Sequence, residues 1–311
     1  MKKLIIPLLC VLLLFCSCNI ITDDDRLTIV ATMFPQYCFA KEVAGDNADV
    51  EMLLDFGVDA HSYEPTPADI MKISRADLFI YTGDSMEIWA KTLLESADVK
   101  KAIESGSLHV LDLSANDSIT LLPMHEHEDE QSHGHEEYDT HIWTSAKNAA
   151  AMCKAIASKL EEIDVANKSA YNENLLAVLT KAELLEEKIT NLKNEFGGKT
   201  LYFGGSFAFR YLFDEAGLEH ASVYEGCASH AEPSAAALAK MVSEIKESGA
   251  EYVLYDTLSE QKIANSIAAE CGATVLHLHA IHNITKAEFD ADEDYFSLME
   301  KNIETLRKAL S

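Results

Sequence analysis

The side chains of this chain that could do chemistry together are histidines, and they lie in segments that are expected to form loops. His61 lies in the segment 61–67, His-Ser-Tyr-Glu-Pro-Thr-Pro, between a strand pattern and a helix pattern. Pro65 and Pro67 fix their own backbone and push the preceding residues out of helical geometry, so a stiff extended loop is expected. A stiff loop can hold one ligand of a metal ion, provided that other histidines converge on it.

Three further histidines follow expected strands. His141 comes after the long loop behind the fourth strand, and His279 and His282 come after the last strand. Loops at the carboxyl ends of parallel strands face a ligand-binding crevice, and neutral imidazole nitrogens bind zinc at about 2.0–2.1 Å. The loop context alone leaves a ligand role and an ordinary structural role about even for His61 and His141.

The other isolated histidines have weaker claims. His230 lies in a second proline-bounded loop, Ser-His-Ala-Glu-Pro-Ser, and is a secondary candidate ligand. His277 alternates with His279 along one expected strand, so it either supports a ligand or packs within the sheet. His109 and His220 are expected to be ordinary structural residues.

A low-complexity run interrupts the expected elements over residues 125–139. It combines acidic side chains with four histidines, which are His125, His127, His133 and His135. Its composition predicts a solvated loop, whether or not the histidines bind metal. Because imidazole and carboxylate together suit divalent metals of intermediate softness, we expect this loop to capture metal weakly, as an auxiliary site.

Strand and helix patterns alternate along the rest of the chain. Expected strands are 27–32, 49–54, 78–82, 108–113, 200–203, 252–256 and 274–279, and expected helices are 36–43, 68–75, 86–105, 145–163, 167–196, 207–215, 235–247, 260–270 and 294–310. The alternation predicts the α/β class, with two Rossmann-like lobes of parallel sheet at 19–166 and 197–311. The helix at 167–196 would span about 45 Å and join the lobes rigidly, with the metal site in the interlobe cleft. Coiled-coil dimerisation through this helix is the alternative.

The composition bounds the class of protein. Of the 311 residues, 48% are hydrophobic, which is enough for two cores. The 52 acidic residues outnumber the 25 basic ones and give a formal charge of −27, which argues against a nucleic-acid partner. A secreted zinc hydrolase is a poor fit, because the chain has no His-Glu-x-x-His motif.

The N-terminus has the pattern of a secretory signal peptide over residues 1–18. Lys2 and Lys3 precede an apolar run at 4–15 that is short for a membrane span. The sequence Phe-Cys-Ser-Cys that ends at Cys18 resembles a bacterial lipobox, so Cys18 is expected to carry lipid and anchor the chain outside the cell membrane. A retained N-terminal anchor helix is the alternative.

Four cysteines remain after this segment, which are Cys38, Cys153, Cys227 and Cys271. Their wide spacing lacks the close pairs of a zinc ribbon or a disulfide-dense scaffold. Buried thiols are therefore expected, with one or two disulfide bridges as the alternative.

Several motifs together resemble the zinc- or manganese-binding solute-binding lipoproteins of bacterial ABC importers. They are His-Ser-Tyr-Glu-Pro-Thr at 61–66, Asp-Thr-His-Ile-Trp at 139–143, the acidic histidine-rich loop, the long helix, and Ala-Glu-Pro-Ser at 231–234. The resemblance covers nearly all of the mature chain in the same order. It implies capture of a divalent metal, with Zn²⁺ expected and Mn²⁺ possible in the same site, for delivery to a membrane permease. It also implies His61 and His141 as ligands.

The third ligand position of the family departs from its pattern here. The usual His or Glu after the first strand of the second lobe is replaced by Ser206, whose neutral hydroxyl is a poor zinc ligand. The chain instead offers His279 and His282 where the family has a carboxylate. We therefore expect His61, His141, His279 and His282 to bind the metal in a monomeric protein, with affinity falling as the pH drops through about 6.5. The alternatives are a manganese- or iron-specific protein of this type, and a surface adhesion lipoprotein with a structural metal.

Overall fold

The computed structural model describes residues 26–123, 138–224, 233–256 and 261–311. Cys18, Cys227, His230 and the four histidines of the 125–139 run lie outside these ranges, so the expectations for them stay predictions. No helix within the described ranges combines the length and the apolar character needed to cross a membrane.

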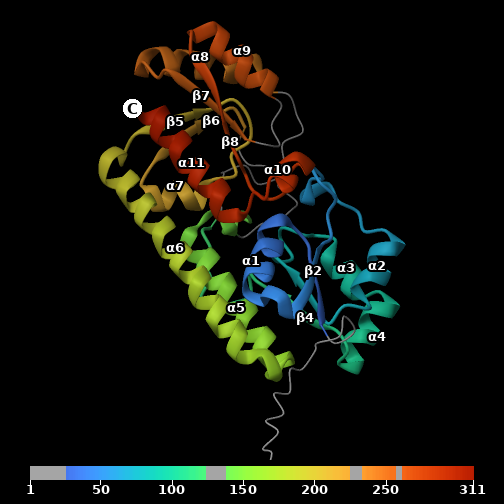
Figure 1. Ribbon diagram of the computed structural model, residues 1–311. Coiled ribbons are helices and arrows are strands. Elements are labelled where there is room, and N and C mark those ends of the chain that lie inside the picture. Colours follow the sequence, from blue (N-terminus) through green and yellow to red (C-terminus); the bar gives the residue numbers. More distant parts are fainter. Residues whose placement is uncertain (1–25, 124–137, 225–232, 257–260) are drawn as a thin grey trace, which may run out of the picture.

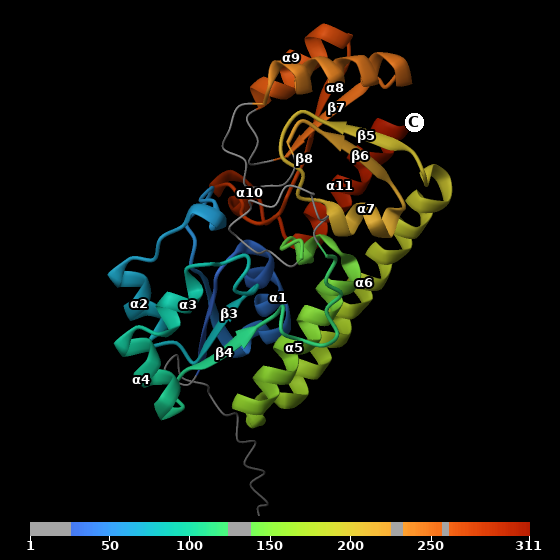
Figure 2. The ribbon, with the colours of Figure 1, turned by 180° about the vertical axis from the view of Figure 1, so that it is seen from behind.

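The first lobe is built on a four-stranded parallel sheet in the order β2-β1-β3-β4. Its strands are β1 (Leu27–Ala31), β2 (Ala48–Met52), β3 (Leu78–Tyr81) and β4 (His109–Asp112). The helices are α1 (Phe34–Ala44), α2 (Pro67–Ile73), α3 (Ala90–Leu94) and α4 (Ala97–Ser105). Figures 1 and 2 show α2, α3 and α4 on the side of the sheet away from α5 and α6. Both faces of the sheet are therefore covered, as its apolar central strands require.

The second lobe repeats this design with a parallel sheet in the order β6-β5-β7-β8. Its strands are β5 (Thr200–Phe203), β6 (Glu219–Ser222), β7 (Tyr252–Asp256) and β8 (Thr274–Leu278), and its helices are α7 (Arg210–Ala216), α8 (Ala235–Ser248), α9 (Gln261–Cys271), α10 (Lys286–Asp290) and α11 (Tyr295–Leu310). The sequence patterns missed β6 and α10. The fold class of two parallel α/β lobes is confirmed.

Two helices connect the lobes. α5 (Ala146–Ile163) leads through a short turn into α6 (Lys168–Phe196), which has 29 residues and spans about 44 Å at about 1.5 Å per residue. Figure 1 shows α6 running along the edge of both lobes. One face packs against α1 and α5 at one end and against α7 and α11 towards the other, which makes it the expected joining element. The apolar side chains on this face of α6 are therefore buried within the chain, whereas Leu176 and Leu184 of the same helix are exposed.

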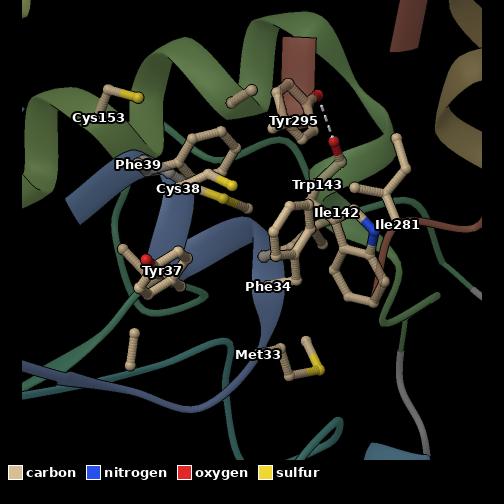
Figure 3. Packing of buried hydrophobic residues seen from close by; sticks show 14 of the residues in the cluster. Met33, Phe34, Tyr37, Cys38, Phe39, Ile142, Trp143, Cys153, Ile281 and Tyr295 are labelled. Carbon is tan, nitrogen blue, oxygen red and sulfur yellow. Dashed lines mark hydrogen bonds between the residues drawn. The ribbon is translucent and has the colours of Figure 1, made fainter. Parts of the chain in front are cut away.

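A shared core lies where the lobes meet. Trp143 and Tyr295 are fully buried there, and Figure 3 shows Trp143 beside Phe34 and Ile281 and Tyr295 beside Phe39. The Trp143 indole Nε1 donates a hydrogen bond to the carbonyl of Ala280 at 2.9 Å, and the Tyr295 hydroxyl donates to the carbonyl of Trp143 at 2.6 Å. These buried bonds tie the segment after β4 to the segment after β8.

Substituting Tyr295 with phenylalanine is expected to lower the free energy of unfolding by about 1–3 kcal/mol. The change removes the donor of the 2.6 Å bond and leaves the buried Trp143 carbonyl without it. Urea denaturation of the metal-free protein measures the loss. Tyr37→Phe is the matched control, since its hydroxyl only accepts a 3.3 Å bond from Lys41. Equal losses for the two variants would contradict this account of the interlobe core.

The described cysteines are not bridged to one another. Cys38, Cys153 and Cys271 are free thiols, and the first two are fully buried or nearly so. Burial raises the thiol pKa of Cys38 and of Cys153 well above the ordinary value. These two side chains therefore behave as small apolar residues of the core. Figure 3 shows Cys38 beside Phe39 and Cys153 on α5.

Candidate metal centre

His61 is held in a short 3-10 turn rather than in a fully extended loop. The turn spans Ala60–Ser62, and the Asp59 carboxylate accepts a hydrogen bond from the His61 backbone N–H at 3.1 Å. Extended backbone begins at Tyr63, after which Thr66 caps α2. The two prolines thus stiffen the second part of the segment, while the Asp59 side chain orders the part that carries His61.

His141 is oriented by a carboxylate two residues before it. Asp139 Oδ1 lies 2.9 Å from the His141 backbone nitrogen and 2.9 Å from its Nδ1. Burial raises the pKa of Asp139, but the charge and hydrogen bonds of His141 outweigh it and bring the pKa below its ordinary value. Because an ionised carboxylate only accepts, Nδ1 carries the proton and the lone pair lies on Nε2. The His61 ring lies beside this imidazole, with 5.6 Å between the ring centroids.

Asparagine at position 139 is expected to weaken zinc binding by about 10–100-fold, the usual effect of losing the partner of a metal-binding histidine. The amide cannot supply the charge that fixes the proton on Nδ1 of His141. Chelator competition measures the affinity, and Asp112→Asn on β4 is a suitable control because Asp112 contacts Tyr81 and Ser114 instead. An unchanged affinity for the Asp139 variant would show that this pair does not serve the site.

The segment after β8 is fixed by contacts from both lobes. Asn302 on α11 donates to the carbonyl of His279 and accepts from its N–H, each at 2.8 Å. Phe34 N–H donates to the carbonyl of His282 at 3.4 Å. The Asn283 amide donates to the carbonyls of Asp55 and Val58, which follow β2, at 2.8 and 2.6 Å. The position of His282 is therefore set relative to the first lobe as well as to its own.

Ile281 has a left-handed backbone with φ +62°, which costs a non-glycine residue about 1–3 kcal/mol. The surrounding hydrogen bonds hold it there, including the bond from its N–H to Nδ1 of His279 at 2.9 Å. Its side chain is fully buried in the shared core. The strained residue turns the chain sharply just before His282.

His282 is the central residue of the group. It is 2% exposed, and both ring nitrogens are buried without a hydrogen bond to any residue of the described chain. Burial lowers its pKa to about 3, with further lowering by His141, His279 and His61. The ring is therefore neutral at physiological pH, lies near the three other histidines, and has one nitrogen lone pair that accepts no hydrogen bond from the described residues.

His279 stands between His282 and an acidic residue. Its pKa is lowered to about 4 by burial, although the nearby Glu288 carboxylate acts in the opposite direction. Nδ1 accepts from Ile281, which places the ring proton on Nε2, and Nε2 lies 3.5 Å from Glu288 Oε1. Binding a metal through Nε2 would require the proton to move to Nδ1 and the bond from Ile281 to break. Sequence patterns did not single out Glu288, because α10 itself was missed.

The low pKa values of His279 and His282 correct one expectation. A midpoint near pH 6.5 for proton competition holds for unperturbed histidines, but burial moves the titration of these two to about pH 4 and 3. The remaining candidates take other positions. Ser206 is half-buried in the segment after β5, His277 lies on β8 with its ring 5.7 Å from that of His279, and the ring of His220 stacks on Phe207.

The four candidate histidines lie near one another but do not form a complete coordination sphere. Within the described residues, no set of three or more His, Cys, Asp or Glu side chains already lies close enough to hold a metal ion. His61 and His141 lie side by side, and His282 is near enough to His61, His141 and His279 for all three to lower its pKa.

Known proteins resemble the chain over nearly its full length. It matches the family described as zinc-uptake complex component A, periplasmic, over residues 29–309. It is 32% identical to the zinc-binding lipoprotein AdcA of Streptococcus pneumoniae over 99% of this chain, and it spans 61% of that relative's length. It is 30% identical to the high-affinity zinc uptake system protein ZnuA of Bacillus subtilis, with 93% of this chain and 89% of the relative covered.

Solved structures agree with the fold. The Zn(II)-bound ZnuA-like domain of S. pneumoniae AdcA is 29% identical, with a TM-score of 0.76 over 92% of this chain and 99% of the other. The laminin-binding protein Lmb of Streptococcus agalactiae, described as bifunctional with adhesin and metal transporting activity, has a TM-score of 0.76 at 28% identity, covering 92% of this chain and all of the other. The chain therefore belongs to the family of zinc-uptake complex component A.

Proposed function

We propose that this protein captures a divalent transition metal, with zinc as the expected ion, outside the cell membrane and delivers it to an ABC permease. The observation that carries the proposal is His282, a buried neutral imidazole whose ring nitrogens make no hydrogen bond within the described residues and which lies near three other histidines. The names of the AdcA and ZnuA relatives, which are zinc-binding and zinc-uptake proteins, support the same ion.

The proposed ligands are His61, His141, His282 and His279. Among them, His61 and His141 lie side by side, and His282 is near enough to both for them to lower its pKa. His279 needs a change of tautomer and the loss of its bond from Ile281. Metal binding would then reorganise the strained segment before His282, and reversing this change would favour release. Ser206 and His230 remain the secondary candidates.

An all-imidazole site favours zinc over manganese, because nitrogen ligands suit zinc and oxygen ligands suit manganese. Metal analysis of the purified protein, followed by competition between the two ions, tests this choice. The proposal predicts one tightly bound zinc per chain that manganese does not displace at equal concentration. Tighter binding of manganese would replace it with the manganese- or iron-specific alternative.

The remaining assignments follow from this role. We propose a signal peptide at 1–18, lipid on Cys18, lobes at 19–166 and 197–311 around the joining helix 167–196, and a monomer at the outer face of the membrane. The histidine-rich run is proposed to collect metal weakly near the main site. The role of carrier involves no chemical conversion, so we propose that the protein is not an enzyme.

A second candidate function is adhesion with metal in a structural role, which the similarity to the Lmb adhesin favours. Chelation separates the two functions, because removing a structural metal unfolds its domain whereas a carrier stays folded. Circular dichroism before and after EDTA treatment measures this. Unchanged spectra support the carrier, and a loss of helical signal would support the structural metal.

A further inference from the structure

Glu87 is a fully buried carboxylate outside the histidine group. It lies between β3 and α3, with no exposed surface. Its oxygens accept hydrogen bonds from Thr32 Oγ1 at 2.6 Å, from Thr82 Oγ1 at 3.1 Å, and from the N–H groups of Thr82 and Gly83 at 3.1 Å. Burial raises the pKa of Glu87, the hydrogen bonds act in the opposite direction, and the net result is a pKa of about 7. Burying such a group is costly, so the arrangement that it stabilises needs an explanation.

The partners of Glu87 lie at the carboxyl ends of two neighbouring strands. Thr32 follows β1 and Thr82 follows β3, and the Gln36 amide donates to the Thr82 hydroxyl from the first turn of α1. The Thr32 carbonyl in turn accepts a 3.2 Å bond from Leu54 N–H, after β2. Glu87 thus holds together the strand ends from which the first-lobe loops depart.

Trp89, two residues further on, contacts the turn that carries His61. Its Nε1 donates to the carbonyl of Ala60 at 3.4 Å, and Ala60 directly precedes His61 and is fully buried. The edge of its ring packs against Tyr63 with 5.2 Å between centroids. One indole therefore contacts the chain on both sides of His61.

We propose that Glu87 is a positioning residue for metal binding, which holds Trp89 against the turn that carries His61. The inference rests on the proposed role of His61 as a ligand. Glutamine in place of Glu87 would turn an NH₂ group towards donors where the carboxylate accepts, so the loop that leads to Trp89 would shift. The expected loss of zinc affinity is about 10-fold or more, in the range found for residues that support metal ligands.

The test combines Glu87→Gln and Trp89→Phe with His61→Ala in the full chain, using chelator competition for zinc affinity and the absorption spectrum of bound Co²⁺. Both single variants should weaken zinc binding and change the cobalt spectrum. Neither should weaken binding further in the His61→Ala background, because the effect passes through His61. Glu300→Gln, an exposed partner of Lys188, is the control and should match the wild type.

Wild-type zinc affinity and cobalt spectra in both Glu87→Gln and Trp89→Phe would overturn the inference, as would losses that add in full to that of His61→Ala. If Glu87→Gln does not fold, Trp89→Phe decides by the same criteria. A wild-type protein that binds no zinc would instead reject the proposed function. Zinc binding that depends on His61 but is unaffected by Glu87 or Trp89 would reject this inference alone.

Discussion

Alanine at position 282 is expected to lower zinc affinity by about 100-fold or more. Zinc bound by a complete set of protein ligands contributes roughly 10–16 kcal/mol, so one of four ligands accounts for about 3 kcal/mol, which corresponds to about 100-fold. His282 should show this loss in full, because its ring nitrogens have no hydrogen-bond partner in the described chain that metal binding would have to break. Chelator competition at pH 7.5 measures the change.

The fold should survive the substitution, since the side chain removed makes no hydrogen bond that the protein would lose. His220→Ala is the control for removing a histidine elsewhere, because its ring stacks on Phe207 in the second lobe. His279→Ala should fall between the two, since His279 must first give up its bond from Ile281. Wild-type affinity in His282→Ala would remove the residue that carries the proposed function.

Metal-free wild-type protein is expected to lose on the order of 3 kcal/mol more stability than His282→Ala when the pH falls from 7.5 to 4.5. The pKa of His282 is about 3 in the folded protein and about 6.5 in an unfolded chain. Above pH 6.5 the ring is neutral in both states, so its contribution to stability is fully present. Below pH 6.5 the unfolded chain takes up a proton that the folded chain refuses, so stability is lost.

Comparing the two proteins at each pH cancels the other titrating groups. This comparison is needed because Glu87 changes the stability in the opposite direction. Its pKa is raised to about 7, so its contribution to the free energy of unfolding is fully present below pH 4.5 and is lost as the pH rises through 7. Urea denaturation in the presence of EDTA gives the four free energies of unfolding. A wild-type–variant difference that does not change with pH would mean that His282 is not held neutral by its surroundings.

Apolar and β-branched runs made most of the fold predictable from sequence. β1, β3 and β5 are nearly or fully buried along most of their length, and their positions were predicted to within a residue or two. β6 was missed because Glu219–Ser222 is exposed or half-buried at a sheet edge and lacks an apolar pattern. α10 was missed although its capping box, formed by Thr285 and Glu288, is a readable signal of a helix start.

The candidate site was predictable in part. Strand-exit positions and family motifs pointed to His61 and His141, and the structure places their rings together. The pairing of Asp139 with His141 that orients the ring was not predicted, although the two residues belong to the same motif. The tautomer of His279 could not be predicted from sequence. It depends on the backbone N–H of Ile281 and on the carboxylate of Glu288, which belongs to α10. The contacts of Glu87 with Thr32 and of Trp89 with Ala60 join residues distant in sequence, which no local pattern encodes.

A crystal structure of the zinc complex, with an anomalous difference map at the zinc absorption edge, tests the central claim most directly. The account predicts one strong peak about 2.0–2.1 Å from ring nitrogens of His61, His141 and His282, with the His279 ring turned to the metal and its bond from Ile281 broken. A strong peak away from these residues, with His282 still unligated, would contradict it.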